Sequence, residues 1–192
     1  MKTRLIGLLF VATLLPACVT YRDFPEDMVN KPPQAKSFDK LYYTLQPFGI
    51  LGTGNGQEAL RTVFQRKTPF ATTERVDAAP AHGLYCNVEV LYKPPTFPAL
   101  IFGYLSVSTL TLIPVWSNHD GYRAIYHVYM DGKEAKLYEY DVTRKGAVWI
   151  GLLPIIWVNA FTYSEAEALE ATTYQFFKDA EPMFVAYKNG KR

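Results

Sequence analysis

The sequence contains few residues of the kinds that carry enzymatic or metal chemistry. Its 192 residues include only two cysteines and three histidines. None of His82, His119 and His127 has a neighbour at metal-ligand spacing. The Gly-x-Ser-x-Gly elbow, the Cys-x-x-Cys pair and the His-Glu-x-x-His helix are also missing. The sequence therefore offers no catalytic residue, no cofactor-binding residue and no metal ligand, and we expect a protein that is not an enzyme.

The remaining polar motifs have simpler structural interpretations. Gly52-Thr53-Gly54-Asn55-Gly56 lacks the following Gly-Lys-Ser/Thr of a phosphate-binding loop, which favours a turn before a helix. Asn118-His119-Asp120 is a polar segment after an apolar run, and Glu139 and Asp141 share one face of a predicted strand. Alternation places Cys86 on the buried face of its strand, and no basic neighbour is present to activate its thiol.

The N-terminus has the pattern of a secretory signal. Lys2 and Arg4 precede an apolar run over residues 5–15, and small residues lead to Cys18. The run is too short to cross roughly 30 Å of hydrocarbon. We therefore predict a signal peptide over residues 1–17.

The residues at the predicted cleavage site also carry a family resemblance. Leu15-Pro16-Ala17-Cys18 resembles the bacterial lipobox, although Pro16 is an unusual residue at its position. The resemblance implies that Cys18 is linked to diacylglycerol and acylated on its amino group, so that the protein is a lipoprotein facing the periplasm. Val19 stands where inner-membrane retention signals usually have aspartate, which implies the outer membrane. The alternative is an ordinary secretory signal with a chance cysteine.

Removal of the predicted signal changes the charge balance. The whole chain has 20 basic and 18 acidic residues. Loss of Lys2 and Arg4 leaves 18 of each (20 − 2 = 18), so the mature chain is formally neutral. No basic surplus remains to indicate nucleic acid as a partner.

The mature chain divides into a short N-terminal tether and one domain. Residues 18–37 are polar, contain Lys31-Pro32-Pro33 and show no apolar periodicity, so we expect an extended tether. Residues 38–192 suit a single domain with a sizeable core. Within it we expect strands over residues 41–51, 70–76 and 84–92, and a helix over residues 56–67 that starts at an Asn55/Glu58 capping box.

A hairpin and a last helix complete the predicted domain. Asp131-Gly132 between residues 122–130 and 137–142 is a turn signal, and a loop of Gly132-Lys133-Glu134 would pair Val128 with Tyr138, Tyr126 with Tyr140 and His127 with Glu139. Arg123, His127, Glu139 and Asp141 would then form a solvated face. Ser164 and Glu167 predict a capped helix that ends before Pro182. We expect an α+β fold, a mainly antiparallel sheet of about five strands with two helices on one face.

Two apolar runs, residues 97–116 and 147–163, do not fit a plain α+β domain. No charged residue occurs between Pro94 and Asn118 or between Gly146 and Ser164. The runs could be core elements, an apolar flap that touches a membrane or a partner, or two transmembrane helices with residues 117–145 in the cytoplasm. The transmembrane interpretation would separate the hairpin from the other strands, and an isolated hairpin is barely stable in water.

The order of elements after a lipidated tether resembles that of small α/β lipoproteins that act as periplasmic accessories to envelope machines. This resemblance implies a non-catalytic interaction protein that is anchored to the membrane through Cys18 and docks an envelope protein or the membrane. The alternative is a lipoprotein that holds a lipid or another apolar ligand between its sheet and the two runs. A continuous exposed apolar patch would favour the first hypothesis, and a spacious apolar pocket would favour the second.

Overall fold

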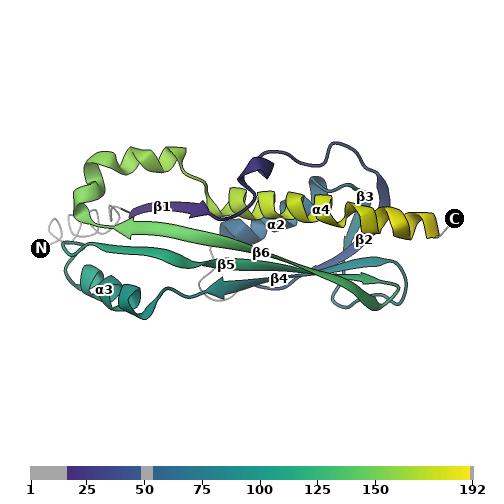
Figure 1. The fold of residues 1–192 in the computed structure, drawn as a ribbon, viewed down its shortest axis with the longest axis horizontal. Helices are drawn as coiled ribbons and strands as arrows, with labels where there is room; N and C mark the ends of the chain where they lie inside the picture. Colours follow the sequence, from purple (N-terminus) through teal and green to yellow (C-terminus); the bar gives the residue numbers. More distant parts are fainter. Residues whose placement is uncertain (1–16, 49–53, 191–192) are drawn as a thin grey trace, which may run out of the picture.

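The protein was analysed as a computed structural model, which describes residues 17–48 and 54–190. The predicted signal peptide lies outside this part except for Ala17, and so do Gly52 and Thr53 of the glycine-rich segment before the first long helix. Figure 1 shows an elongated molecule in which one long sheet runs from end to end.

The sheet has six strands in the order β1-β6-β5-β4-β2-β3. The α+β class is therefore confirmed, but the expectation of a mainly antiparallel five-stranded sheet is right only in outline. Strand β2 lies parallel to both of its neighbours, while the other three pairings are antiparallel. The strands are β1 (Ala17–Arg22), β2 (Phe38–Leu45), β3 (Phe70–Arg75), β4 (Leu84–Lys93), β5 (Val115–Met130) and β6 (Lys133–Val148).

The parallel pairing follows from the connection between β2 and β3. Helix α2 (Gly54–Arg66) links these adjacent strands, and a helical crossover returns the chain in the same direction. The predicted helix end near residue 67 is confirmed, whereas the helix begins at Gly54, before the predicted capping box. Strand β2 ends at Leu45, earlier than the predicted residue 51.

The segment expected to be an extended tether begins instead as a strand. Residues 17–22 pair along the whole end of β6, and Tyr21 and Phe24 are buried. Tyr21 stacks on Tyr122 of β5 with ring centroids 6.4 Å apart. Burial of these aromatic rings stabilises the pairing of the segment with the sheet. The processing of residues 1–17 stays a prediction.

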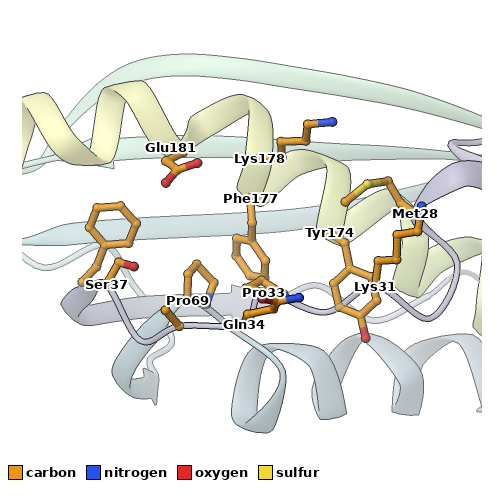
Figure 2. Close-up of a pocket in the computed structure, with 12 residues that line it drawn as sticks. Met28, Lys31, Pro33, Gln34, Ser37, Pro69, Tyr174, Phe177, Lys178 and Glu181 are labelled. Carbon is orange, nitrogen blue, oxygen red and sulfur yellow. The ribbon is translucent and has the colours of Figure 1, made fainter.

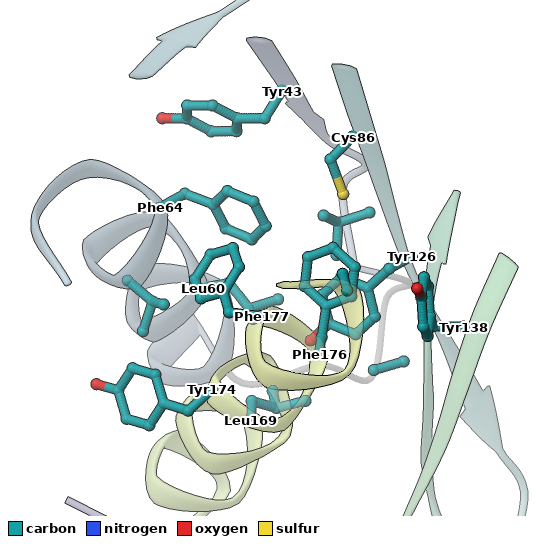
Figure 3. Packing of buried hydrophobic residues seen from close by; sticks show 14 of the residues in the cluster. Tyr43, Leu60, Phe64, Cys86, Tyr126, Tyr138, Leu169, Tyr174, Phe176 and Phe177 are labelled. Carbon is teal, nitrogen blue, oxygen red and sulfur yellow. The ribbon is translucent and has the colours of Figure 1, made fainter. Parts of the chain in front are cut away.

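Two helices cover one face of the sheet, as expected. Helix α4 (Glu165–Gly190) packs against α2, and the aromatic rings between the helices and the sheet form the core (Figure 3). Tyr126 stacks on Phe176 with centroids 4.3 Å apart. Cys86 is fully buried in this core, which confirms the face assigned to it from alternation.

The start of α4 was predicted correctly, but its end was not. The Ser164 hydroxyl accepts a hydrogen bond from the Glu167 amide at 3.2 Å, and the Glu167 carboxylate accepts one from the Ser164 amide at 2.9 Å. These are the two bonds of a capping box. The helix continues through Pro182 because Phe184, one turn on from Ala180, is fully buried and packs against Phe38 and Phe70.

The hairpin of β5 and β6 is longer than predicted and has a different register. Its turn contains only Asp131 and Gly132, both with positive φ (49° and 77°), as a type I′ turn requires. The register consequently shifts by two residues, so that Tyr126 faces Tyr138 rather than Tyr140 and His127 faces Leu137 rather than Glu139. A shift of two leaves each side chain on its predicted face.

Candidate functional site: the apolar tip and the neck

The two apolar runs lie together at one end of the molecule. The first forms α3 (Phe97–Ser108) before β5, and the second forms the 3-10 helix η2 (Ile150–Phe161) after β6. Figure 1 places both beside the shared end of β1, β5 and β6, at the end opposite the C-terminus. We call residues 97–116 and 147–161 the apolar tip, and the sheet with α2 and α4 the body.

The large apolar side chains of α3 are exposed around most of the helix, and only the side that carries Ala99 and Ser106 is covered. Leu100, Ile101 and Phe102 follow one another at steps of about 100°, and their exposed fractions are 54%, 45% and 51%. Only Ser106 is buried. An ordinary amphipathic helix hides one apolar stripe against its own protein. Helix α3 does not.

Segment η2 is exposed in the same way. None of its residues is buried, and exposed apolar side chains run almost without interruption from Leu153 to Val158. All three tryptophans of the chain lie in the apolar tip, and Trp116, Trp149 and Trp157 are 68%, 42% and 62% exposed. The expectation that these runs are core elements is therefore wrong for most of their side chains. Within the described ranges, no helix has the length and apolar character needed to cross a membrane.

Backbone hydrogen bonds hold the two parts of the tip in place. Leu110 and Thr111 adopt positive φ after α3, and the carbonyl of Thr111 accepts a bond of 3.0 Å from the amide of Ile150. On the other side, the Tyr21 amide donates to the carbonyl of Tyr163 at 3.2 Å, so the chain after η2 covers the outer edge of β1. The tip is thus built onto the sheet on both sides.

Cys18, the predicted lipidation site, lies at the base of this tip. It occupies β1 opposite Ala147 of β6, and Trp116 of β5 pairs with the same Ala147. Its side chain is partly exposed. The predicted anchor and the exposed apolar surface therefore share one end of the molecule.

A band of charged residues separates the tip from the body. We call Arg22, Lys93, Asp120, Arg144 and Lys145 the neck. They are the charged residues nearest the tip on their four strands, β1, β4, β5 and β6. The sheet register brings them into neighbouring rows, because Arg22 pairs with Thr143, Lys93 with Gly121, Asp120 with Arg144 and Thr20 with Lys145.

The centre of the neck is a buried ion pair. Asp120 is fully buried and accepts a hydrogen bond of 2.6 Å from Nε of Arg144 and another from the hydroxyl of Ser117. Gly121 follows with φ of 150°, and a Cβ at this position would collide with the carbonyl oxygen of Val142. The bulge between Ser117 and Asp120 and the close approach at Gly121 thus aim the carboxylate at Arg144.

A buried carboxylate connects the neck to both helices. Glu165 at the start of α4 accepts hydrogen bonds from the hydroxyls of Tyr21 at 3.3 Å and Tyr122 at 3.4 Å. A Cβ at Gly56 of α2 would collide with this carboxylate, so glycine permits the close packing there. Burial, reinforced by the charge of Glu165, raises the pKa of Tyr122 to about 12 and also raises the pKa of Tyr21.

The body carries a separate pocket of about 330 Å³ between α4 and the segment that precedes β2. Figure 2 shows Met28, Tyr174 and Phe177 lining it together with Lys31 and Glu181. Two hollows next to the tip are smaller, about 140 and 200 Å³, and both are lined in part by Trp116. Small-molecule pockets usually span about 300–1,000 Å³. Each of these two hollows is therefore smaller than a typical ligand pocket.

The residues weighed for chemistry in the sequence do not come together. Nδ1 of His127 lies 2.8 Å from a carboxylate oxygen of Glu134, which accepts the hydrogen bond, and His119 lies beside Asn118. Burial raises the pKa of the Cys86 thiol, which opposes a role as a nucleophile. Among residues 17–48 and 54–190, no group of three or more possible ligand side chains could hold a metal ion.

The acidic pair on the hairpin is part of a solvated charge network. Asp141 accepts a hydrogen bond of 2.9 Å from Arg123 and lies 3.4 Å from Lys93, and hydrogen bonding by Arg123 lowers the pKa of Asp141. Glu139 lies 3.9 Å from Arg123. The predicted solvated face is confirmed.

Asp120, Arg144 and Glu165 were missed as a cluster because their proximity depends on strand pairing and on packing of α4.

The chain has only distant structural likeness to known proteins. No protein-family model and no curated protein matches it. Two solved structures of the PelC dodecamer from Paraburkholderia phytofirmans match, one of them a single-substitution variant, each with 12% identity over 81% of this chain and 96% of the other. The TM-scores are 0.27 for the variant and 0.24 for the other structure. Similarity at this level does not establish a shared fold or function.

Proposed function

We propose that the protein is a lipoprotein anchored through Cys18 to an envelope membrane, where its folded body acts in the periplasm as a non-catalytic interaction protein. The observation that carries this proposal is the position of Cys18 at the base of the apolar tip. An acylated cysteine there would bring the exposed apolar helices to the membrane and direct the body away from it. By the resemblance at Val19, the outer membrane is the proposed location.

The ligand-binding alternative has less support. A lipid carrier needs an enclosed apolar cavity, whereas the apolar side chains of the tip are displayed on its outside. A continuous exposed patch of this kind is the mark of a docking surface. The larger pocket in Figure 2 lies on the body, away from the two runs, and includes charged residues in its lining.

The anchor is tested by comparing the two cysteines of the chain. Cys18→Ser should remove the acyl mass from the N-terminal peptide and should leave unprocessed precursor or a protein that mild washing releases from membranes. Cys86→Ala is the matched control and should keep both the mass and the membrane fractionation. If the Cys18→Ser protein keeps the same acyl mass and fractionation, the proposed anchor is wrong.

The interaction role is tested by photo-crosslinking in intact cells from a probe at Leu137, an exposed position on the hairpin of the body. We expect a discrete protein adduct from this position in the lipidated protein. The same probe in the Cys18→Ser protein should lose the adduct, because the body is no longer held at the membrane. Absence of any protein adduct from probes across the body would count against an interaction role.

A further inference from the structure

We infer that the apolar tip is embedded in the interfacial zone of a phospholipid bilayer, with α3 and η2 among the acyl chains and the neck at the level of the headgroups. This inference rests on the proposed function for the identity of the membrane. It goes further by assigning a second, protein-made attachment that does not depend on the acyl chains of Cys18.

The wide exposed surface of α3 identifies the kind of partner. A protein groove covers one stripe of a helix, with anchors at spacings of three and four residues. Consecutive residues Leu100, Ile101 and Phe102 point in three directions and are all exposed. A fluid apolar medium can surround the exposed part of such a helix, whereas a groove covers one stripe of it. Phe97, Tyr104 and Val107, exposed by 74%, 76% and 69%, extend this surface to both ends of the helix.

The lengths of the two segments limit the depth. Helix α3 has 12 residues and is about 18 Å long at 1.5 Å per residue. The hydrocarbon core is about 30 Å thick. A helix of this length cannot cross the core, so it enters the membrane from one side only.

The neck supplies a boundary to this insertion. Cys18 and Ala147 pair three residues along β6 from Arg144, which is about 10 Å at the rise of a strand. Four of the five neck residues are basic. Arg22, Lys93 and Arg144 are paired with carboxylates, whereas Lys145, in the row nearest the tip, is exposed. An exposed lysine at this level complements lipid phosphates, and tryptophans are enriched at the same depth in membrane proteins.

Two exposed hydroxyls of the tip are compatible with an apolar surrounding, while those of Ser106 and Thr111 are buried without a hydrogen-bond partner among the described residues. The hydroxyls of Ser108 and Thr109 donate to the carbonyls of Tyr104 and Leu105, each at 2.8 Å. Hydroxyls that bond back to their own helix no longer require water. The amide of Thr111 likewise donates to the carbonyl of Ser106 at 2.7 Å at the end of α3.

The three tryptophans provide a direct test, because all of them lie in the tip. The full chain is purified from membranes in detergent and reconstituted into vesicles of phosphatidylcholine and phosphatidylglycerol, with or without bromine on the acyl chains. We expect the tryptophan emission to shift to shorter wavelength and to be quenched by brominated lipid, and aqueous iodide to quench it poorly. The control carries Trp116→Phe, Trp149→Phe, Trp157→Phe and Leu137→Trp, and its single tryptophan on the body should respond to iodide and not to bromine.

A matched pair of double variants separates insertion from unfolding. Ile101→Glu with Val158→Glu places two carboxylates in the tip, and Leu91→Glu with Leu137→Glu places two at body positions of similar exposure. Both proteins should keep the circular dichroism spectrum of the unchanged chain, because all four side chains are exposed. Quenching by brominated lipid should fall several-fold in the tip variant alone, because carboxylates resist transfer into acyl chains.

Two results would overturn the inference. One is tip fluorescence that iodide quenches and brominated lipid does not, in protein that floats with the vesicles. The other is a blue-shifted tip that brominated lipid does not reach, together with self-association of the chain, since a second copy would then cover the tip. The mass of the N-terminal peptide is read on the same sample. An acylated Cys18 with an unquenched tip refutes the inference alone, and a quenched tip without acylation refutes the proposed anchor alone.

Discussion

The body and the apolar tip both contain many large apolar side chains, but they use them in opposite ways. In the body, Val128 and Phe176 are fully buried between the sheet and α4. In the tip, Val107 and Phe161 are 69% and 81% exposed. Burial within the chain holds the body together, so its stability depends on each packed side chain. The tip contributes little to this core, and its apolar residues are available to another medium.

The largest difference between the regions should follow from the same substitution at two valines. Val128→Asp should unfold the protein, because an unpaired buried carboxylate costs several kcal/mol against a total stability of about 5–15 kcal/mol. Val107→Asp should leave the melting temperature in detergent nearly unchanged while weakening contact with lipid. Thermal melting followed by circular dichroism measures the stability of both variants. Equal loss of stability at the two positions would mean that α3 packs as part of the core.

A smaller effect is expected from two arginine–aspartate pairs on the same hairpin. Arg144→Ala leaves the fully buried Asp120 without its cation, and we expect a loss of about 3 kcal/mol. Arg123→Ala breaks the solvated pair with Asp141 and should cost less than about 1 kcal/mol.

Urea unfolding gives both values, and a further substitution checks their origin. Adding Asp120→Asn to Arg144→Ala should restore part of the stability, because the buried charge is then removed. No difference between Arg144→Ala and Arg123→Ala would show that the neck pair is as solvated as the surface pair.

The smallest effect concerns alkaline pH. The pKa of Tyr122 is raised to about 12 in the folded chain, against about 10 when unfolded. Its contribution to stability is therefore complete below about pH 10 and is lost as the pH rises toward 12. At neutral pH, Tyr122→Phe should be less stable than the unchanged chain. Between about pH 10 and 12, however, its free energy of unfolding should fall by up to about 2 kcal/mol less than that of the unchanged chain.

The exposed Tyr104 of the tip serves as the control for this prediction. Tyr104→Phe should retain the full pH dependence of the unchanged chain, because that side chain is 76% exposed. Unfolding by urea at several pH values measures the slopes. If Tyr122→Phe retains the same slope as the Tyr104→Phe control, the buried tyrosine cluster does not govern the alkaline response.

The features that the sequence could predict are those that depend on residues close together in the chain. The capping box at Ser164 and the Asp131-Gly132 turn are local, and both were found. The register after that turn was missed because a shift of two residues buries the same faces, so the apolar pattern cannot distinguish the two registers. Strand β1 was missed because its partner, β6, is more than 120 residues away and its own six residues lack a clear apolar alternation.

The candidate site shows the same limit. The lipobox resemblance singled out Cys18, and the absence of charge singled out both apolar runs. Their convergence at one end depends on the pairing of Cys18 and Trp116 with Ala147, which no local pattern encodes. The neck was missed for the same reason, since Asp120 and Arg144 become neighbours only through the long hairpin and its bulge.

Hydrogen exchange in detergent-free vesicles, compared between the unchanged full-length protein and its Ile101→Glu, Val158→Glu variant at matched pH, tests most directly whether the two regions face different media. The amides of residues 97–112 and 149–161 should exchange more slowly in the unchanged protein, because lipid covers these segments and they lack a protein core to keep them closed. The amides of α2, α4 and β4 should be unchanged. Slowing spread evenly over the body, or no slowing in the two tip segments of vesicle-bound protein, would contradict the assignment of the tip to lipid and the body to water.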